Sequence, residues 1–263
     1  MSGEVLDFYN QMTDDYHLIL TDWDSAVRSQ ASSIKKLIQK HISDTNTLSI
    51  LDCSCGIGTQ AIGLALEGYK VTGTDISPKE IERAKKEAKR LGASVSFHVA
   101  NFQKLEETLT DKYDIILSFD NAVAHLKDVG ELQSAFTAMR KSLKPNGAIL
   151  ISVRNNDELR AQKPCGTLPR VIEDQFGKRI IVQTWGWNNA GDAYDLTMFI
   201  LQKKRNEWRS QSYPSVPMRA FNQEEINQVL KLSGAIDIKW FSTPESGYYQ
   251  PVVMAKFREQ PTQ

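Results

Sequence analysis

The sequence predicts an α/β fold with a doubly wound sheet. Short apolar runs alternate with amphipathic helical patterns between residues 48 and 153. The first run, residues 48–52, ends in an acid and leads into a turn of small residues at 53–58. An apolar segment with helical character, residues 59–66, follows directly. Strands that alternate with helices in this way are typical of a parallel sheet covered by helices on both faces.

The segment before the first strand predicts helices. Residues 1–24 contain closely spaced aromatic side chains, namely Phe8, Tyr9, Tyr16 and Trp23. We expect this segment to fold over a site as a lid of one or two short helices. Residues 25–42 follow with Ala31, Ile34, Leu37, Ile38 and Ile42 at helical spacing, which predicts an amphipathic helix. Residues 44–47 are expected to form a loop.

The elements of the predicted core, residues 25–154, have recognisable ends. Gly68 suits the end of the first helix after the turn, and a second strand over 70–74 ends at Asp75. Ser77 followed by Pro78 predicts a helix N-terminus, and Gly92 ends that helix. Further strands are predicted at 95–99, 113–119 and 148–153, with a helix over 132–143 and a turn at 144–147.

The pattern changes after Arg154. Two β-like runs, 179–187 and 194–203, flank a loop rich in Asn and Gly, which predicts a hairpin. With a third strand near Trp208 and Tyr213, it would form an inserted antiparallel lid over 155–218. Asn222 and Glu225 predict a capping box for a helix over 224–232. Strands at 235–241 and 251–257 would complete the core sheet within 219–263.

Composition excludes several classes of protein. Lysine and arginine together number 32, as do aspartate and glutamate, so we expect no nucleic-acid partner. No apolar stretch is long enough to span a bilayer, and the polar N-terminus is unlike a secretory signal. Three cysteines do not make a disulfide framework, and Cys53 with Cys55 offers too few ligands for a metal. We therefore predict a cytoplasmic protein with neither a membrane partner nor a metal.

The turn after the first strand predicts a nucleotide-like ligand. Gly56 and Gly58 allow close approach of the backbone, and the following helix presents free N–H groups. Residues 56–61 fit the G-x-G-x-x-G/A dinucleotide pattern, with Asp75 where a ribose-binding acid is expected. The turn alone therefore leaves a nicotinamide-dependent oxidoreductase open.

Features around the turn favour another ligand. Asp52 precedes it, the pair Asn101-Phe102 ends the third strand, and the turn at 143–147 precedes the fifth. With these features the sequence resembles the class I S-adenosylmethionine-dependent methyltransferases, whose glycine motif has the form D-x-G/A-x-G-x-G. Ser54 departs from that motif but is still small. The resemblance implies a Rossmann-like sheet and S-adenosylmethionine as cofactor.

The resemblance is sharper to the glycine N-methyltransferase-like subgroup. That subgroup carries an Asn-aromatic pair, an Asn-x-x-x-His-Leu element and an arginine followed by Asn-x-Asp. Residues 101–102, 121–126 and 154–157 match these elements in turn. The subgroup also implies assembly into homo-oligomers through the N-terminal region.

The resemblance assigns cofactor contacts to the N-terminal segment, the turn and the strand ends. These residues are Tyr9, Arg28, Asp52, Ser54, Gly56, Gly58, Asp75, Ile76, Asn101, Phe102 and Phe119. Asp75 would accept hydrogen bonds from both ribose hydroxyls, whereas a cap for the Ser77 helix is its structural alternative. Asn101 would bind the adenine edge, and Arg28 the carboxylate of the methionine moiety.

Acceptor and catalytic roles are expected for Arg154, Asn121, Tyr16 and Trp23. Arg154 leaves the carboxyl end of a buried strand, where doubly wound sheets bind ligands, and its guanidinium suits a small carboxylate. Its structural alternative is an ion pair with Asp157 or Glu158, and His125 is expected to be structural.

We predict methyl transfer to a small molecule, the amine of glycine or of a related amino acid or carboxylate. Three alternatives remain open from the residues. They are methylation of a protein or tRNA, nicotinamide-dependent oxidoreduction, and a cofactor-binding regulatory protein without turnover.

Overall fold

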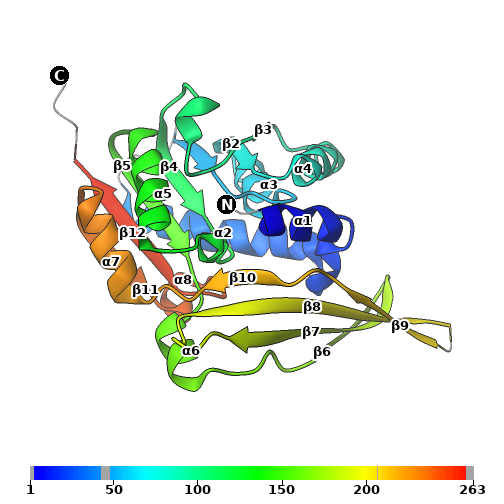
Figure 1. Cartoon of the computed structure of the whole chain (residues 1–263). Helices are drawn as coiled ribbons and strands as arrows, with labels where there is room; N and C mark the ends of the chain where they lie inside the picture. Colours follow the sequence, from blue (N-terminus) through cyan, green and yellow to red (C-terminus); the bar gives the residue numbers. More distant parts are fainter. Residues whose placement is uncertain (1–2, 43–47, 206, 259–263) are drawn as a thin grey trace.

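The computed structural model describes residues 3–42, 48–205 and 207–258, so the expected loop at 44–47 lies outside the described residues. Its larger sheet has seven strands in the order β11-β12-β5-β4-β1-β2-β3 (Figure 1). Five strands are parallel: β1 (Ser49–Asp52), β2 (Lys70–Asp75), β3 (Val95–Val99), β4 (Tyr113–Ser118) and β5 (Leu143–Ser152). β11 (Ala235–Phe241) and β12 (Val252–Phe257) close one edge as an antiparallel pair. The predicted doubly wound α/β fold is confirmed.

Helices cover both faces of this sheet because alternate strand residues point to opposite sides. Ile115 and Leu117 of β4 pack on one side, in a cluster with α2 (Trp23–His41), α3 (Thr59–Leu66) and α4 (Pro78–Leu91). Ile116, between them, packs on the other side with α5 (Val129–Lys141) and α7 (Gln223–Leu232).

The helix ends follow the capping residues in the sequence. The Ser77 side chain accepts a hydrogen bond from the Glu80 N–H at 3.1 Å, Pro78 occupies the first turn of α4, and Gly92 ends it at φ +72°. The Asn222 and Glu225 side chains form the predicted reciprocal capping box of α7. Both predictions are confirmed.

A second, antiparallel sheet follows the core. Its strands are β6 (Arg170–Asp174), β7 (Gly177–Trp187), β8 (Ala193–Lys204) and β10 (Val216–Arg219), in the order β10-β8-β7-β6, while β9 (Glu207–Ser212) pairs with β8. The predicted hairpin is confirmed as β7 and β8. The sequence prediction missed β6 and also β10, whose Pro217 is tolerated because the strand lies at a sheet edge.

The N-terminal segment lies between the core and the second sheet (Figure 1). It consists of α1 (Gly3–Met12) and a short 3-10 helix (Tyr16–Ile19), as predicted. Val5, Phe8 and Met12 of α1 pack in one hydrophobic cluster with inward-facing residues of β8 and β10. The first helix thus joins the two parts of the molecule.

Several expected boundaries are wrong. The turn predicted at 144–147 lies inside β5 as an irregularity, with Asn146 at φ +59°, so Leu143 belongs to a strand rather than to the preceding helix. α2 begins at Trp23, where the Asp22 carboxylate caps it. Two short helices, α6 (Asn156–Gln162) and α8 (Thr243–Ser246), were not predicted.

Candidate active site

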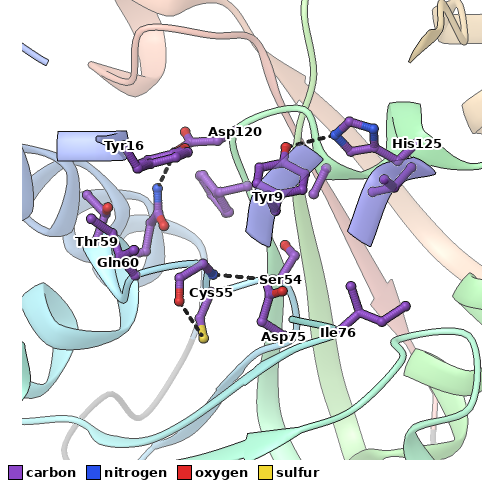
Figure 2. A pocket seen from close by; sticks show the side chains of 15 residues that line it. Tyr9, Tyr16, Ser54, Cys55, Thr59, Gln60, Asp75, Ile76, Asp120 and His125 are labelled. Carbon is purple, nitrogen blue, oxygen red and sulfur yellow. Dashed lines mark hydrogen bonds between the residues drawn. The ribbon is translucent and has the colours of Figure 1, made fainter. Parts of the chain in front are cut away.

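The first cavity opens at the carboxyl ends of β1, β2 and β4 and is covered by the N-terminal segment. With its mouth it encloses about 560 Å³. Figure 2 shows Tyr9 and Asp120 on one side and Ser54 and Asp75 on the other. The lining residues are Val5, Tyr9, Tyr16, Ser54, Cys55, Gly56, Ile57, Thr59, Gln60, Asp75, Ile76, Phe119, Asp120, Ala122 and His125.

The turn after β1 forms the floor of this cavity. Gly58 caps α3 at φ +96°, and a Cβ there would lie 2.7 Å from the Ile62 side chain. The Cys55 N–H donates to the Thr74 carbonyl at 2.9 Å, which ties the turn to β2. The positive φ angle and this contact favour glycine at position 58.

Asp75 is held at the end of β2 with its carboxylate in the cavity. It accepts hydrogen bonds from the Gly56 N–H at 3.0 Å and the Ser77 N–H at 2.9 Å. Burial raises the pKa of Asp75, whereas these two donors lower it. Each carboxylate oxygen can accept a further donor, so the ribose role and the helix-capping role are compatible.

Two other acids near the turn are fully buried. Burial raises the pKa of Asp52 to about 8 and that of Glu80 to about 8, and the charge of Asp75 raises that of Glu80 further. The Asp52 carboxylate lies behind the turn, where it is 3.4 Å from the Ser54 nitrogen. Neither residue lines the first cavity.

The N-terminal segment closes the cavity through polar contacts. The Tyr9 hydroxyl lies 2.8 Å from Nε2 of His125, and the Ser77 hydroxyl donates to the Asn10 side chain at 2.7 Å. Burial raises the pKa of the Tyr9 hydroxyl and lowers that of His125 to about 4. At neutral pH this contact therefore joins a neutral phenol to a neutral imidazole.

A second cavity adjoins the first and lies between the core and the antiparallel sheet. It encloses about 1290 Å³ with its mouth and shares Tyr9, Tyr16, Asp120 and His125 with the first. Its walls are largely apolar; they include Phe8, Met12, Ile19, Leu20, Ile181, Leu196, Met198, Val216 and Met218. Asn121, Arg154 and Gln183 are among its polar residues.

Arg154 extends from the end of β5 into the second cavity. Its guanidinium donates to the Tyr194 hydroxyl at 2.7 Å and to Oε1 of Gln183 at 3.2 Å, and it lies over the Trp185 ring at 4.7 Å. These partners are all neutral. The alternative ion pair with Asp157 or Glu158 is not formed, since the Arg154 side chain makes no ion pair within the described residues.

The structure brings most of the expected site residues to the two cavities. The residues that line one or both are Tyr9, Tyr16, Ser54, Gly56, Asp75, Ile76, Phe119, Asn121 and Arg154. The expected cofactor residues Asp52, Gly58, Asn101 and Phe102 lie outside both linings. Phe102 is 1% exposed within the core, and the Asn101 side chain accepts from the Gln103 N–H. The roles of these four stay predictions.

Two expected residues point elsewhere. Arg28 is exposed and lies outside both linings, on the α2 surface away from the buried stripe of Val27 and Ala31. Trp23 is buried at the start of α2, where its indole donates to the Thr59 hydroxyl at 3.1 Å. We therefore build the proposed site without them.

Sequence reasoning missed two polar residues at the junction of the cavities, Gln60 and Asp120. One signal was available, because Asp120 follows the end of the central strand β4, and strand ends of doubly wound sheets bind ligands.

Comparisons with known proteins identify the family. The family model described as "Methyltransferase domain" matches residues 44–174. The ubiquinone biosynthesis O-methyltransferase of Rickettsia prowazekii (strain Madrid E) is 32% identical over 182 residues, which cover 65% of this chain and 69% of the relative.

The chain belongs to the S-adenosylmethionine-dependent methyltransferases. A glycine/sarcosine N-methyltransferase of Parasynechococcus marenigrum (strain WH8102) is a more distant relative, 24% identical over 206 residues, with 74% of this chain and 71% of the relative covered. The Streptomyces venezuelae protein DesVI shares the fold of this methyltransferase, with a TM-score of 0.75 at 19% identity over 95% of this chain and 98% of DesVI.

The methyltransferase has two adjoining cavities, as a reaction between a cofactor and an acceptor requires. Gly56 and the Asp75 carboxylate line the first of them. Among the described residues, no helix combines the length and apolar character needed to cross a membrane.

Proposed function

We propose that the enzyme methylates a small molecule that carries an anionic group, most simply the amine of an amino acid or a related carboxylate. The observation that carries the proposal is Arg154, which presents a guanidinium to the second cavity with only neutral partners. A carboxylate would satisfy this charge through two parallel hydrogen bonds.

The cofactor would occupy the first cavity. Asp75 would accept from the ribose hydroxyls, and the turn at Gly56 would lie against the cofactor backbone. When bound, S-adenosylmethionine supplies a methyl group on a sulfonium, and its sulfur leaves as a neutral thioether. The residues of the chain position the acceptor and exclude water, which is the main requirement of an in-line transfer to a neutral nucleophile.

The lining of the second cavity supports an acceptor larger than glycine. The second cavity has mostly apolar walls, which suit an apolar body beside the polar group at Arg154. The glycine/sarcosine N-methyltransferase relative favours an amine nucleophile, and the ubiquinone biosynthesis O-methyltransferase relatives favour a hydroxyl. A protein or tRNA acceptor is the macromolecular alternative.

The test is a methyl-transfer screen with mass detection. It compares amino acids of increasing side-chain size with the amines that lack the carboxylate, with carboxylated and unsubstituted phenols, and with a bulk protein and tRNA sample. We expect carboxylated acceptors to react at least about tenfold faster than their counterparts without a carboxylate, a difference equal to about 1.4 kcal/mol. Equal rates, or methylation of the protein or tRNA sample alone, would overturn the proposal.

A further inference from the structure

Asp120 occupies the boundary between the two cavities. It follows the last residue of β4 and lines both cavities together with Tyr9, Tyr16 and His125. A group at this place can reach both the cofactor and the acceptor.

The backbone of Asp120 is left-handed and is held by β5. Asp120 and Asn121 adopt φ angles of +56° and +66°, a left-handed conformation that non-glycine residues rarely adopt. The end of β5 holds this conformation, because the Asp120 N–H donates to the Ser152 hydroxyl at 2.7 Å and the Asn121 N–H to the Ser152 carbonyl at 3.1 Å. Such strain persists where surrounding structure imposes it, commonly at functional sites.

The carboxylate of Asp120 has only neutral partners. It accepts hydrogen bonds from the Gln60 amide at 2.9 Å, from the Tyr249 hydroxyl at 2.6 Å and from the Tyr248 hydroxyl (Figure 2 shows the Gln60 bond). None of these donors carries a charge. No lysine, arginine or histidine forms an ion pair with Asp120 in the part of the chain that the structure describes.

The second cavity therefore carries one acid, Asp120, and two arginines, Arg154 and Arg170. The Arg170 guanidinium donates to the Ile19 carbonyl, and within the described residues no ion pair joins Asp120 to either arginine. Arg154 and Asp120 follow the adjacent parallel strands β5 and β4, and Oδ1 of Asn121, next to Asp120, accepts from the Arg154 N–H at 3.1 Å. The guanidinium itself is occupied by Tyr194 and Gln183 rather than by Asp120. Charges that face a largely apolar cavity without opposite charges favour ligands that supply them.

We infer that Asp120 binds the amine of the acceptor in its cationic form while Arg154 binds the anionic group, so that the acceptor binds as a zwitterion. Where this amine is the nucleophile, it loses its proton to solvent before its lone pair takes up the methyl group. This inference rests on the proposed function for the role of Arg154. The inference goes beyond the proposed substrate class in two respects: it gives the acceptor a cationic amine, and it names Asp120 as the residue that selects for that charge. Asp120 is then a specificity-determining residue at the point where the acceptor meets the cofactor.

Two probes of the same shape test the inference without any chemical step. N,N,N-trimethylglycine and 3,3-dimethylbutanoate both carry a carboxylate and three methyl groups, but only the first carries a positive charge. Each is titrated by calorimetry into the full chain saturated with S-adenosylhomocysteine. We expect the wild-type enzyme to bind trimethylglycine at least about tenfold more tightly than the uncharged isostere.

Asp120→Asn removes the charge, retains the size of the side chain and suits a left-handed backbone. We expect this variant to bind the two probes within about twofold of one another, with the affinity for dimethylbutanoate unchanged. Asp111→Asn, an exposed control, should keep the wild-type preference. Far-ultraviolet circular dichroism and a cooperative urea unfolding transition establish that each variant is folded.

The inference is overturned if the wild-type enzyme does not prefer trimethylglycine, or if Asp120→Asn retains the preference. A third outcome also overturns it. If Asp120→Asn lowers the affinity for S-adenosylmethionine more than that for S-adenosylhomocysteine, and the variant still prefers trimethylglycine, then Asp120 faces the sulfonium of the cofactor rather than the amine of the acceptor. Arg154→Lys separates the two proposals. This variant should bind both probes more weakly, and by the same factor, because both carry a carboxylate. If neither affinity falls, the proposed carboxylate role of Arg154 is wrong. The preference for trimethylglycine over dimethylbutanoate then still tests Asp120.

Discussion

The Tyr9 hydroxyl lies 2.8 Å from Nε2 of His125, and this contact joins α1 to the short helix after β4. The two residues are 116 positions apart in the chain. Their rings meet edge to face, with centroids 5.3 Å apart, and both line the two cavities. The contact therefore holds the N-terminal cover against the core where cofactor and acceptor would meet.

Tyr9→Phe should loosen this cover. The substitution removes the hydroxyl and leaves a buried imidazole nitrogen without its partner, which costs about 1–2 kcal/mol of unfolding free energy. We expect a several-fold weaker affinity for S-adenosylmethionine in calorimetry. Tyr69→Phe, which also removes a hydroxyl but lies outside both cavities, is the control. An unchanged affinity for Tyr9→Phe would show that the contact does not support cofactor binding.

His125 should make the protein less stable in acid. Burial lowers its pKa from 6.5 to about 4, so between these values the unfolded chain binds a proton that the folded chain does not. Stability is then lost as pH falls from about 6.5 to about 4, by up to about 3 kcal/mol for this group. Urea unfolding at pH 7 and pH 4.5 should show a smaller loss for His125→Asn than for the wild type. The exposed His98→Asn should behave as the wild type does.

Asp75→Asn should weaken the cofactor. The amide keeps the size of the carboxylate but has one acceptor oxygen instead of two, so a ribose hydroxyl competes with Gly56 and Ser77 for it. We expect at least about a tenfold loss of S-adenosylmethionine affinity, or about 1.4 kcal/mol. Isothermal calorimetry measures it, with Asp111→Asn as the control. A loss below twofold would remove Asp75 from the cofactor site.

Arg154→Lys should affect the acceptor rather than the cofactor. Lysine keeps the charge but loses the planar group that donates to Tyr194 and Gln183 and stacks on Trp185. For carboxylated acceptors we expect KM to rise about tenfold or more, with cofactor affinity changed less than twofold. Arg209→Lys, at an exposed site on β9, is the control. Equal KM values for Arg154→Lys and the wild type would contradict the proposed carboxylate site.

At high pH, the Glu80→Gln variant should be more stable to unfolding than the wild-type protein without ligand. Burial and the neighbouring Asp75 raise the pKa of Glu80 to about 8, so the folded chain retains a proton that the unfolded chain loses. The wild type therefore loses stability as pH rises from about 4.5 to about 8, by up to about 1.4 kcal/mol per pH unit for this group. The glutamine variant lacks this loss. Urea unfolding at pH 5 and pH 8 should show its advantage only at the higher pH, whereas the exposed Glu82→Gln should show none.

Much of the fold could be predicted because its signals are local. The apolar runs, the Ser77-Pro78 start of α4 and the capping box at Asn222 each depend on neighbouring residues. The sequence did not predict β10, which contains Pro217, because a proline is acceptable in a strand only at a sheet edge, and the edge position of β10 is a feature of the tertiary structure. The position of Arg28 on the exposed face of α2, beside the buried stripe of Val27 and Ala31, became visible only in the structure, and its cofactor role stays a prediction.

The sequence by itself determined the order of the core elements, the glycine turn with Asp75 and the family to which they belong. Those features are set by residue spacing, which local backbone geometry converts directly into structure. Only the tertiary structure decided that Tyr9 meets His125, that Arg154 has only neutral partners, and that Asp120 lies between two cavities. Such relationships depend on how distant elements pack, and packing is settled by the whole chain rather than by any segment of it.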